Sequence, residues 1–184
     1  MRVIAGSARN HKLFSLKGID IRPTADRVKE AVFSSLGQTV TDARVLDLFA
    51  GSGAIGIEAL SRGAKFCVFV DSSYECVQLI KQNLTHTKLS DKSKIIHGDA
   101  FGAIKSFSVD EQFDIIYIDP PYGKGLIVPA LEKIIQKKIL APGGTIVAEC
   151  GRTENVICPP GLGIIKQKVY GAAKNLYIVA ADTE

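Results

Sequence analysis

Little in this 184-residue chain suggests metal binding, disulfide bonds or membrane insertion. Its four cysteines (67, 76, 150 and 158) show no C-x-x-C spacing, and its three histidines share no motif with them. We therefore expect free thiols, no metal site and a cytoplasmic location. No apolar stretch is long enough to cross a bilayer, and the amino terminus lacks the apolar region of a signal peptide. A hydrophobic content of 46% predicts one domain with a substantial core.

Basic residues are concentrated at the amino terminus. Residues 1–44 contain eight basic and four acidic residues, and so account for the whole net charge of +4. Residues 45–184 hold equal numbers of both signs. A basic segment in front of a neutral body favours a polyanionic partner, although a solvated basic face would have the same charge.

From residue 44 onward, candidate strands and helices alternate. Strands are predicted at 44–48, 65–70, 94–97, 113–118 and 145–150, and helices at 54–62, after Ser73, and at 126–138. A tight turn is expected at 141–144. The last two β-like runs, 163–170 and 175–181, are too close for a parallel crossover, so they predict an antiparallel pair. The fold class is therefore α/β: a doubly wound, mostly parallel, Rossmann-like sheet that ends in an antiparallel hairpin. We predict a single domain over 1–184, with a basic extension (1–43) before a catalytic core (44–184).

The most informative segment is Asp119-Pro120-Pro121-Tyr122, which directly follows the apolar run 113–118. Prolines donate no backbone hydrogen bond and hold the preceding residue extended, so the strand must end at Asp119. The carboxyl edge of such a sheet is where ligands bind. The segment places a carboxylate, free carbonyls and a flat ring at this edge. The carboxylate and carbonyls can bind the amino group of a planar substrate, and the ring can stack on its face.

A second motif follows the first strand. Gly51, Gly53 and Gly56 form G-x-G-x-x-G, and Asp71 lies twenty residues after Gly51, the pattern of a nucleoside cofactor site. Asp47, four residues before the first glycine, would oppose a pyrophosphate but suits the cationic amino-acid part of S-adenosylmethionine. The spacing therefore favours S-adenosylmethionine over NAD. Asp99, after the third strand, either accepts a hydrogen bond from adenine or caps the following helix.

Together these motifs resemble the class I S-adenosylmethionine-dependent methyltransferases, and the amino terminus is more specific. Arg2–Gly6, Lys12-Leu13 and Ile21–Phe33, with its Arg-Pro-Thr-x-Asp-Arg run, resemble the RsmD-like family, which methylates the guanine N2 amine of small-subunit ribosomal RNA. One departure is Asp71, where many relatives have glutamate; either acid can reach ribose hydroxyls. The resemblance implies a methyltransferase whose partner is ribosomal RNA, either free or within a small-subunit particle.

The resemblance also assigns site residues. Catalytic roles are implied for Asp119, Pro120 and Tyr122. Cofactor contacts are implied for Asp47, Phe49, Ala50, Gly51, Gly53, Asp71, Asp99 and Ala100. RNA contacts are implied for Arg22, Thr24, Arg27 and Lys29. Thr24 is also expected to cap a helix that runs to about Leu36. The alternative for 27–30, a solvated helix face with a local ion pair, is less favoured than an RNA role.

The expected chemistry is transfer of a methyl group to an exocyclic amine whose lone pair is delocalised into the ring. Acceptance of the amine hydrogens by Asp119 and the Pro120 carbonyl would free that lone pair, while Tyr122 stacks on the base. An adenine-N6 methylase and a non-catalytic RNA-binding assembly factor remain alternatives. A protein-glutamine methylase would usually have asparagine at 119. An NAD-dependent oxidoreductase would need a hydride-handling partner that no motif supplies.

Overall fold

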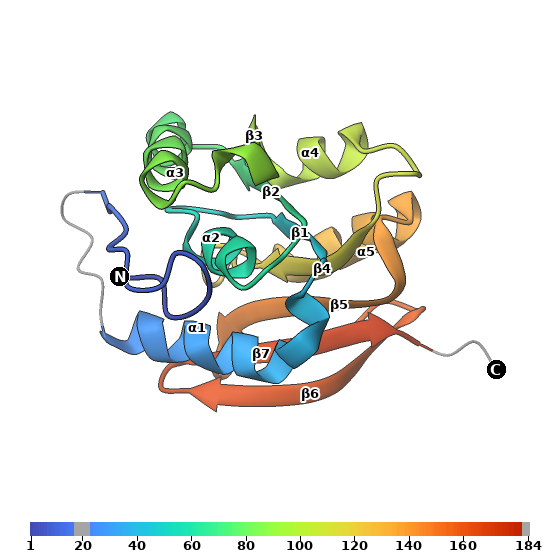
Figure 1. The fold of residues 1–184 in the computed structure, drawn as a ribbon. Coiled ribbons are helices and arrows are strands. Elements are labelled where there is room, and N and C mark those ends of the chain that lie inside the picture. The colour runs from blue at the N-terminus through green and yellow to red at the C-terminus, as the bar shows by residue number, and fades with distance from the viewer. Residues whose placement is uncertain (17–22, 182–184) are drawn as a thin grey trace.

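The computed structural model describes residues 1–16 and 23–181, and the side chains in the second range from residue 26 onward. A seven-stranded sheet forms the centre of the molecule (Figure 1). The strands are β1 (Arg44–Asp47), β2 (Phe66–Asp71), β3 (Ser93–His97), β4 (Phe113–Ile118), β5 (Leu140–Gly151), β6 (Leu162–Tyr170) and β7 (Ala173–Ala180). The helices are α1 (Pro23–Leu36), α2 (Ala54–Ser61), α3 (Tyr74–Thr87), α4 (Ala100–Ser106) and α5 (Ile127–Lys137), with short 3₁₀ turns at Gly37–Val40 and Ser90–Lys92.

The strand order is β3-β2-β1-β4-β5-β7-β6. Strands β1 to β5 pair in parallel, whereas β7 pairs antiparallel with both β5 and β6. The predicted doubly wound sheet with an antiparallel end is thus confirmed. After β3 the chain returns across the sheet to place β4 on the other side of β1, so the carboxyl ends of β1 and β4 flank the point at which the strand order reverses.

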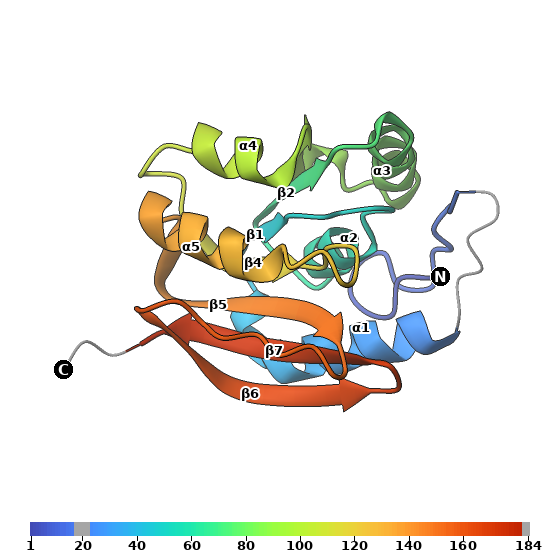
Figure 2. The same cartoon turned by 180° about the vertical axis from the view of Figure 1, so that it is seen from behind.

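Two apolar cores cover the two faces of the sheet. One core joins α1, α2 and α3 to the face that carries Val45, Tyr117 and Tyr177. The other joins α4 and α5 to the face that carries Ile116 and Ile146. Neighbouring residues of one strand belong to different cores because successive side chains of a strand point to opposite faces of the sheet. Strands that are buried on both faces are therefore almost continuously apolar. Figure 2 shows α5 and the β5–β7–β6 end of the sheet from behind.

Two local predictions differ from the structure. The turn expected at 141–144 lies within β5 as a bulge: Phe113 pairs with Leu140, but Ile115 pairs with Thr145. Gly143 adopts a φ of 74° there, which loops the extra residues out of the ladder. The amino-terminal helix begins at Pro23, so Thr24 lies in its first turn rather than at the cap. A proline is favoured at the first helical position because its missing N–H would have no helical partner there.

The amino-terminal segment is attached to α2 through one buried acid. Glu58 is fully buried, and its carboxylate accepts hydrogen bonds from the backbone N–H groups of Ile4 (2.8 Å) and Ala5 (3.1 Å). The same carboxylate pairs with Arg62 Nε at 2.7 Å and with Lys29 Nζ at 3.3 Å. These contacts bring α1, α2 and the first residues of the chain together.

Lys29 was expected to contact RNA, and the structure contradicts this. Its side chain is only 2% exposed, because its ammonium lies between Glu58, Asp26 and the carbonyl oxygen of Arg2, to which it donates. Burial lowers the pKa of Lys29, and Glu58 opposes that effect. Lys29 is thus a buried ion-pair partner, not a free surface charge.

The described residues contain neither a membrane-spanning helix nor a metal-binding cluster. No helix there is long and apolar enough to cross a membrane. Within the same residues, no group of three or more His, Cys, Asp or Glu side chains is arranged to hold a metal ion.

Candidate active site

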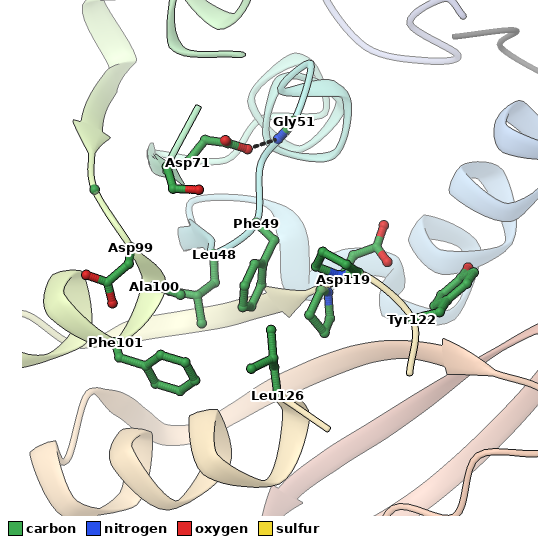
Figure 3. Close-up of a pocket in the computed structure, with 14 residues that line it drawn as sticks. Leu48, Phe49, Gly51, Asp71, Asp99, Ala100, Phe101, Asp119, Tyr122 and Leu126 are labelled. Carbon is green, nitrogen blue, oxygen red and sulfur yellow. Dashed lines mark hydrogen bonds between the residues drawn. The ribbon is translucent and has the colours of Figure 1, made fainter. Parts of the chain in front are cut away.

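A cleft of about 640 Å³ opens at the carboxyl ends of β1 to β4. Its walls come from the segments that follow these four strands and from the start of α5 (Figure 3). The lining residues are Leu48, Phe49, Gly51, Asp71, Ser72, Gly98, Asp99, Ala100, Phe101, Asp119, Pro120, Pro121, Tyr122 and Leu126. The cleft therefore lies where the reversal of strand order predicts a ligand site.

The glycine loop has the geometry that its spacing predicts. Gly51 and Gly53 adopt φ values of 53° and 77°, which residues with a side chain rarely adopt. A Cβ atom on Gly56 would lie 2.2 Å from the Phe69 ring, so this glycine allows α2 to pack closely on β2. Asp71 fixes the loop, because its Oδ2 accepts a 2.7 Å hydrogen bond from the Gly51 N–H.

Asp71 and Asp99 both line the cleft, and each also makes structural contacts. The second Asp71 oxygen accepts a hydrogen bond from the Ser73 N–H at 2.8 Å, which leaves a lone pair on each oxygen. Asp99 caps α4 by accepting from the Gly102 N–H at 2.9 Å. The capping alternative for Asp99 is thus observed, and one of its oxygens keeps both lone pairs.

Asp47, which is predicted to contact the cofactor, lies behind the glycine loop. It is 2% exposed, does not line the cleft, and accepts a hydrogen bond from the Gly56 N–H at 3.1 Å. Burial raises its pKa to about 7. Asp47 therefore stabilises the loop through its hydrogen bond with the Gly56 N–H. Ala50 and Gly53 shape the same loop without lining the cleft.

The segment after β4 forms the opposite side of the cleft. In Figure 3, Asp119 and Tyr122 lie across the cleft from Asp99 and Phe101, on the side of α1. Burial raises the pKa of Asp119 well above its usual range, and the nearby carboxylates of Glu149 and Asp47 raise it further. The Tyr122 side chain is 55% exposed, so its ring is available for stacking. The structure brings Asp119, Pro120 and Tyr122 to one rim, as predicted.

The charge of the lining distinguishes between classes of ligand. Three aspartates, Asp71, Asp99 and Asp119, line the cleft, and none of its described lining residues is basic. Such a surface repels a pyrophosphate, which needs donors and positive charge, and favours a ligand that carries a cation. The aromatic and aliphatic side chains of Phe49, Phe101 and Leu126 provide apolar walls for a flat base.

Of the four predicted RNA residues, only Arg27 and Lys29 have side chains that the structure describes, and both lie on α1. Arg27 is exposed on α1, whereas Lys29 is buried. Arg22 lies outside the described residues, and so does the side chain of Thr24.

Sequence reasoning missed Glu149, which lies beside this rim. Its two carboxylate oxygens accept hydrogen bonds from the hydroxyls of Tyr117 (2.9 Å) and Tyr122 (2.7 Å). An acid at the end of the apolar run 145–150, as at Asp119, was the available signal. Phe101 and Leu126, which line the cleft, gave no comparable signal because each continues an apolar helical pattern.

Comparison with known proteins identifies the family. Residues 1–179 match the family model described as Conserved hypothetical protein 95. The chain belongs to this family. A Bacillus subtilis relative, "Putative rRNA methyltransferase YlbH", is 38% identical, with 93% of this chain and 94% of the relative covered. "Ribosomal RNA small subunit methyltransferase D" of Haemophilus influenzae is 33% identical, with 93% and 89% covered. These relatives agree with the resemblance to the RsmD-like family.

A solved structure supports the same family at the level of the fold. The protein described as "Putative methyltransferase yhhF from Escherichia coli" superimposes with a TM-score of 0.87 at 29% identity, covering 97% of this chain and 96% of that one. The likeness includes both the sheet and the amino-terminal extension, since almost the whole of each chain is covered.

Proposed function

We propose that this protein is an S-adenosylmethionine-dependent methyltransferase that modifies the N2 amine of a guanine in small-subunit ribosomal RNA. The observation that carries the proposal is the rim formed by Asp119, Pro120 and Tyr122 beside a cleft lined by acids. The relatives named as ribosomal RNA methyltransferases support the class of substrate. A cytoplasmic location follows from such a substrate.

The residues of the cleft fit S-adenosylmethionine. Its sulfonium and ammonium groups suit the acidic lining, Asp71 has lone pairs for the ribose hydroxyls, and Asp99 has an oxygen free for the adenine amine. When bound, it supplies the methyl group: the S–CH₃ bond breaks as the N–CH₃ bond forms, and the sulfonium becomes a thioether.

On the acceptor side, the chain itself positions the amine. Asp119 and the Pro120 carbonyl accept its two hydrogens, which turns the nitrogen lone pair towards the methyl group and stabilises the positive charge that develops on nitrogen. One proton then leaves the nitrogen, to Asp119 or through it to water. Asp119 must be ionised for this role, and the positive charge in the filled cleft favours its ionised form despite burial. Tyr122 stacks on the unpaired base.

Nucleoside analysis tests the reaction. Small-subunit ribosomal RNA from cells lacking the protein, either naked or as the assembled particle, is incubated with purified protein and S-adenosylmethionine, digested, and analysed by mass spectrometry. We expect N2-methylguanosine in at least one of the two arms. N6-methyladenosine instead would favour the adenine alternative, and no methylated nucleoside in either arm would favour the non-catalytic assembly factor.

Cofactor choice gives a first quantitative prediction. Calorimetry should show binding of S-adenosylmethionine and S-adenosylhomocysteine but none of NAD or NADP, because no described lining residue is basic. Asp71→Asn should weaken the binding of S-adenosylhomocysteine by about tenfold or more, since it removes charged hydrogen-bond acceptors. Asp91→Asn, at an exposed acid outside the cleft, is the control. Binding of NAD with no response to S-adenosylhomocysteine would contradict the proposed cofactor.

The exposed α1 residue Arg27 gives a prediction about RNA. Arg27→Ala should weaken RNA binding and reduce the slope of log affinity against log salt by about 0.7, the value for one lost contact to a single-stranded phosphate. Lys105→Ala removes an exposed charge from α4, on the opposite face of the sheet, and should leave the slope unchanged. Equal slopes for Arg27→Ala and the unmodified protein, with both folded, would place the RNA surface elsewhere.

A further inference from the structure

Glu149 lies outside the cleft lining but contacts the acceptor rim, because its carboxylate accepts a hydrogen bond from the Tyr122 hydroxyl. In the β4–β5 pair, Ile118 is aligned with Ala148, so Asp119 and Glu149 occupy the next positions of adjacent strands. Both follow residues that face the α4–α5 side, and therefore both point to the α1 side. The effect of Glu149 on the pKa of Asp119 reflects this proximity.

Two tyrosines hold the Glu149 carboxylate in place. The buried Tyr117 donates to one oxygen and Tyr122 donates to the other. Burial, followed by the influence of Glu149, raises the pKa values of both tyrosines, so both keep their protons and remain donors. An ionised carboxylate has about four acceptor sites, and each oxygen therefore keeps one for another donor.

A buried side chain next to Glu149 has polar atoms that lack hydrogen-bond partners among the described residues. Asn175 lies directly opposite Glu149 in the β5–β7 pair and is fully buried. Among the residues that the structure describes, neither its amide nitrogen nor its amide oxygen has a hydrogen-bond partner. A buried amide is normally paired, so the hydrogen bonding around Glu149 is incomplete within the described residues.

We propose that Glu149 determines base specificity by accepting the ring N1–H of the guanine whose N2 amine Asp119 holds. This inference rests on the proposed function, because it concerns the same acceptor. Guanine carries two adjacent donors on its Watson–Crick edge, the N1–H and the N2 amine, and two neighbouring carboxylates match them. Adenine has an unprotonated N1 next to its N6 amine, and a carboxylate there would face a lone pair. Glu149 thus selects guanine while Asp119 positions the reacting nitrogen.

A base analogue separates recognition from methyl transfer. 2-Aminopurine keeps the 2-amine but lacks the N1–H. The probes are two otherwise identical small-subunit ribosomal RNA fragments that carry guanine or 2-aminopurine at the mapped target, supplied within the reconstituted particle if naked RNA is inactive. The unmodified enzyme should favour guanine in kcat/KM by about a hundredfold or more, because a site built around a substrate N–H rejects an analogue without it.

Glu149→Gln is the decisive variant. Its amide keeps the shape of the side chain but can donate to an unprotonated ring nitrogen, so the preference for guanine should fall to within about tenfold, while S-adenosylhomocysteine binding is retained. Tyr122→Phe keeps the stacking ring, removes one of the two hydrogen bonds to Glu149, and should lower the same ratio by a smaller factor. This second variant covers the case in which Glu149→Gln fails to fold.

The outcomes distinguish this inference from the proposed function. Transfer to guanine with an unchanged guanine preference in the folded variants overturns the role of Glu149 alone. Transfer by the unmodified enzyme to both fragments at equal rates does the same. No transfer to guanine by the unmodified enzyme overturns the proposed function, and the inference with it.

Discussion

Replacing Asp119 with alanine should reduce methyl transfer by about a hundredfold or more, because removal of one positioned electrostatic partner commonly has an effect of this size. The affinity for S-adenosylhomocysteine should be nearly unchanged, since the proposed contact of Asp119 is with the amine of the acceptor base at the rim of the cleft. Single-turnover rates on the ribosomal RNA substrate measure the first effect, and calorimetry measures the second.

A matched control for Asp119 lies on β4, the strand that ends directly before it. Asp114 is exposed on β4 and accepts a hydrogen bond from the Arg44 N–H at 2.7 Å, at the edge of the sheet far from the cleft. Asp114→Ala should keep near-normal turnover, although it removes that contact. Near-normal turnover in Asp119→Ala would refute the proposed role of this carboxylate.

Glu58→Ala should lower the free energy of unfolding by about 3–5 kcal/mol, the usual cost of removing one partner from a buried ion pair. The substitution leaves the Lys29 ammonium without its nearest buried partner and removes the acceptor of the Ile4 and Ala5 N–H groups. Urea unfolding measures the change. Loss of the Lys29 proton limits the cost, because burial already lowers the pKa of this side chain.

A double variant tests whether the unpaired buried charge of Lys29 causes the loss of stability. Glu58→Gln combined with Lys29→Met removes both charges, whereas Glu58→Gln alone leaves the Lys29 ammonium buried without its carboxylate. The double variant should therefore be more stable than Glu58→Gln alone. If Glu58→Ala lies within about 1 kcal/mol of the unmodified protein, the amino-terminal segment is held by its apolar contacts instead.

The sequence predicted the strands around the cleft well because their signals are local. The β4 bounds match the expected run, since an apolar segment that ends in Asp119-Pro120-Pro121 has a chemically defined stop. The glycine loop was equally clear, because positive φ angles and close helix packing require glycine at defined positions.

The errors come from contacts between distant segments. Lys29 looked like a surface charge because its partner Glu58 is on another helix, and no local pattern shows that both are buried. Asp47 looked like a ligand-binding acid, but the path of the loop places it behind the glycines. Glu149 gained its importance only when the β4–β5 register placed it beside Asp119.

Mass mapping of small-subunit ribosomal RNA tests most directly our proposal that this protein methylates the N2 amine of one guanine in that RNA. RNA from cells that lack the protein should lose one N2-methylguanosine at a single position. The unmodified protein should restore that methyl group, and Asp119→Ala should not. A small-subunit RNA whose guanine methylation is the same with and without the protein would contradict the claim.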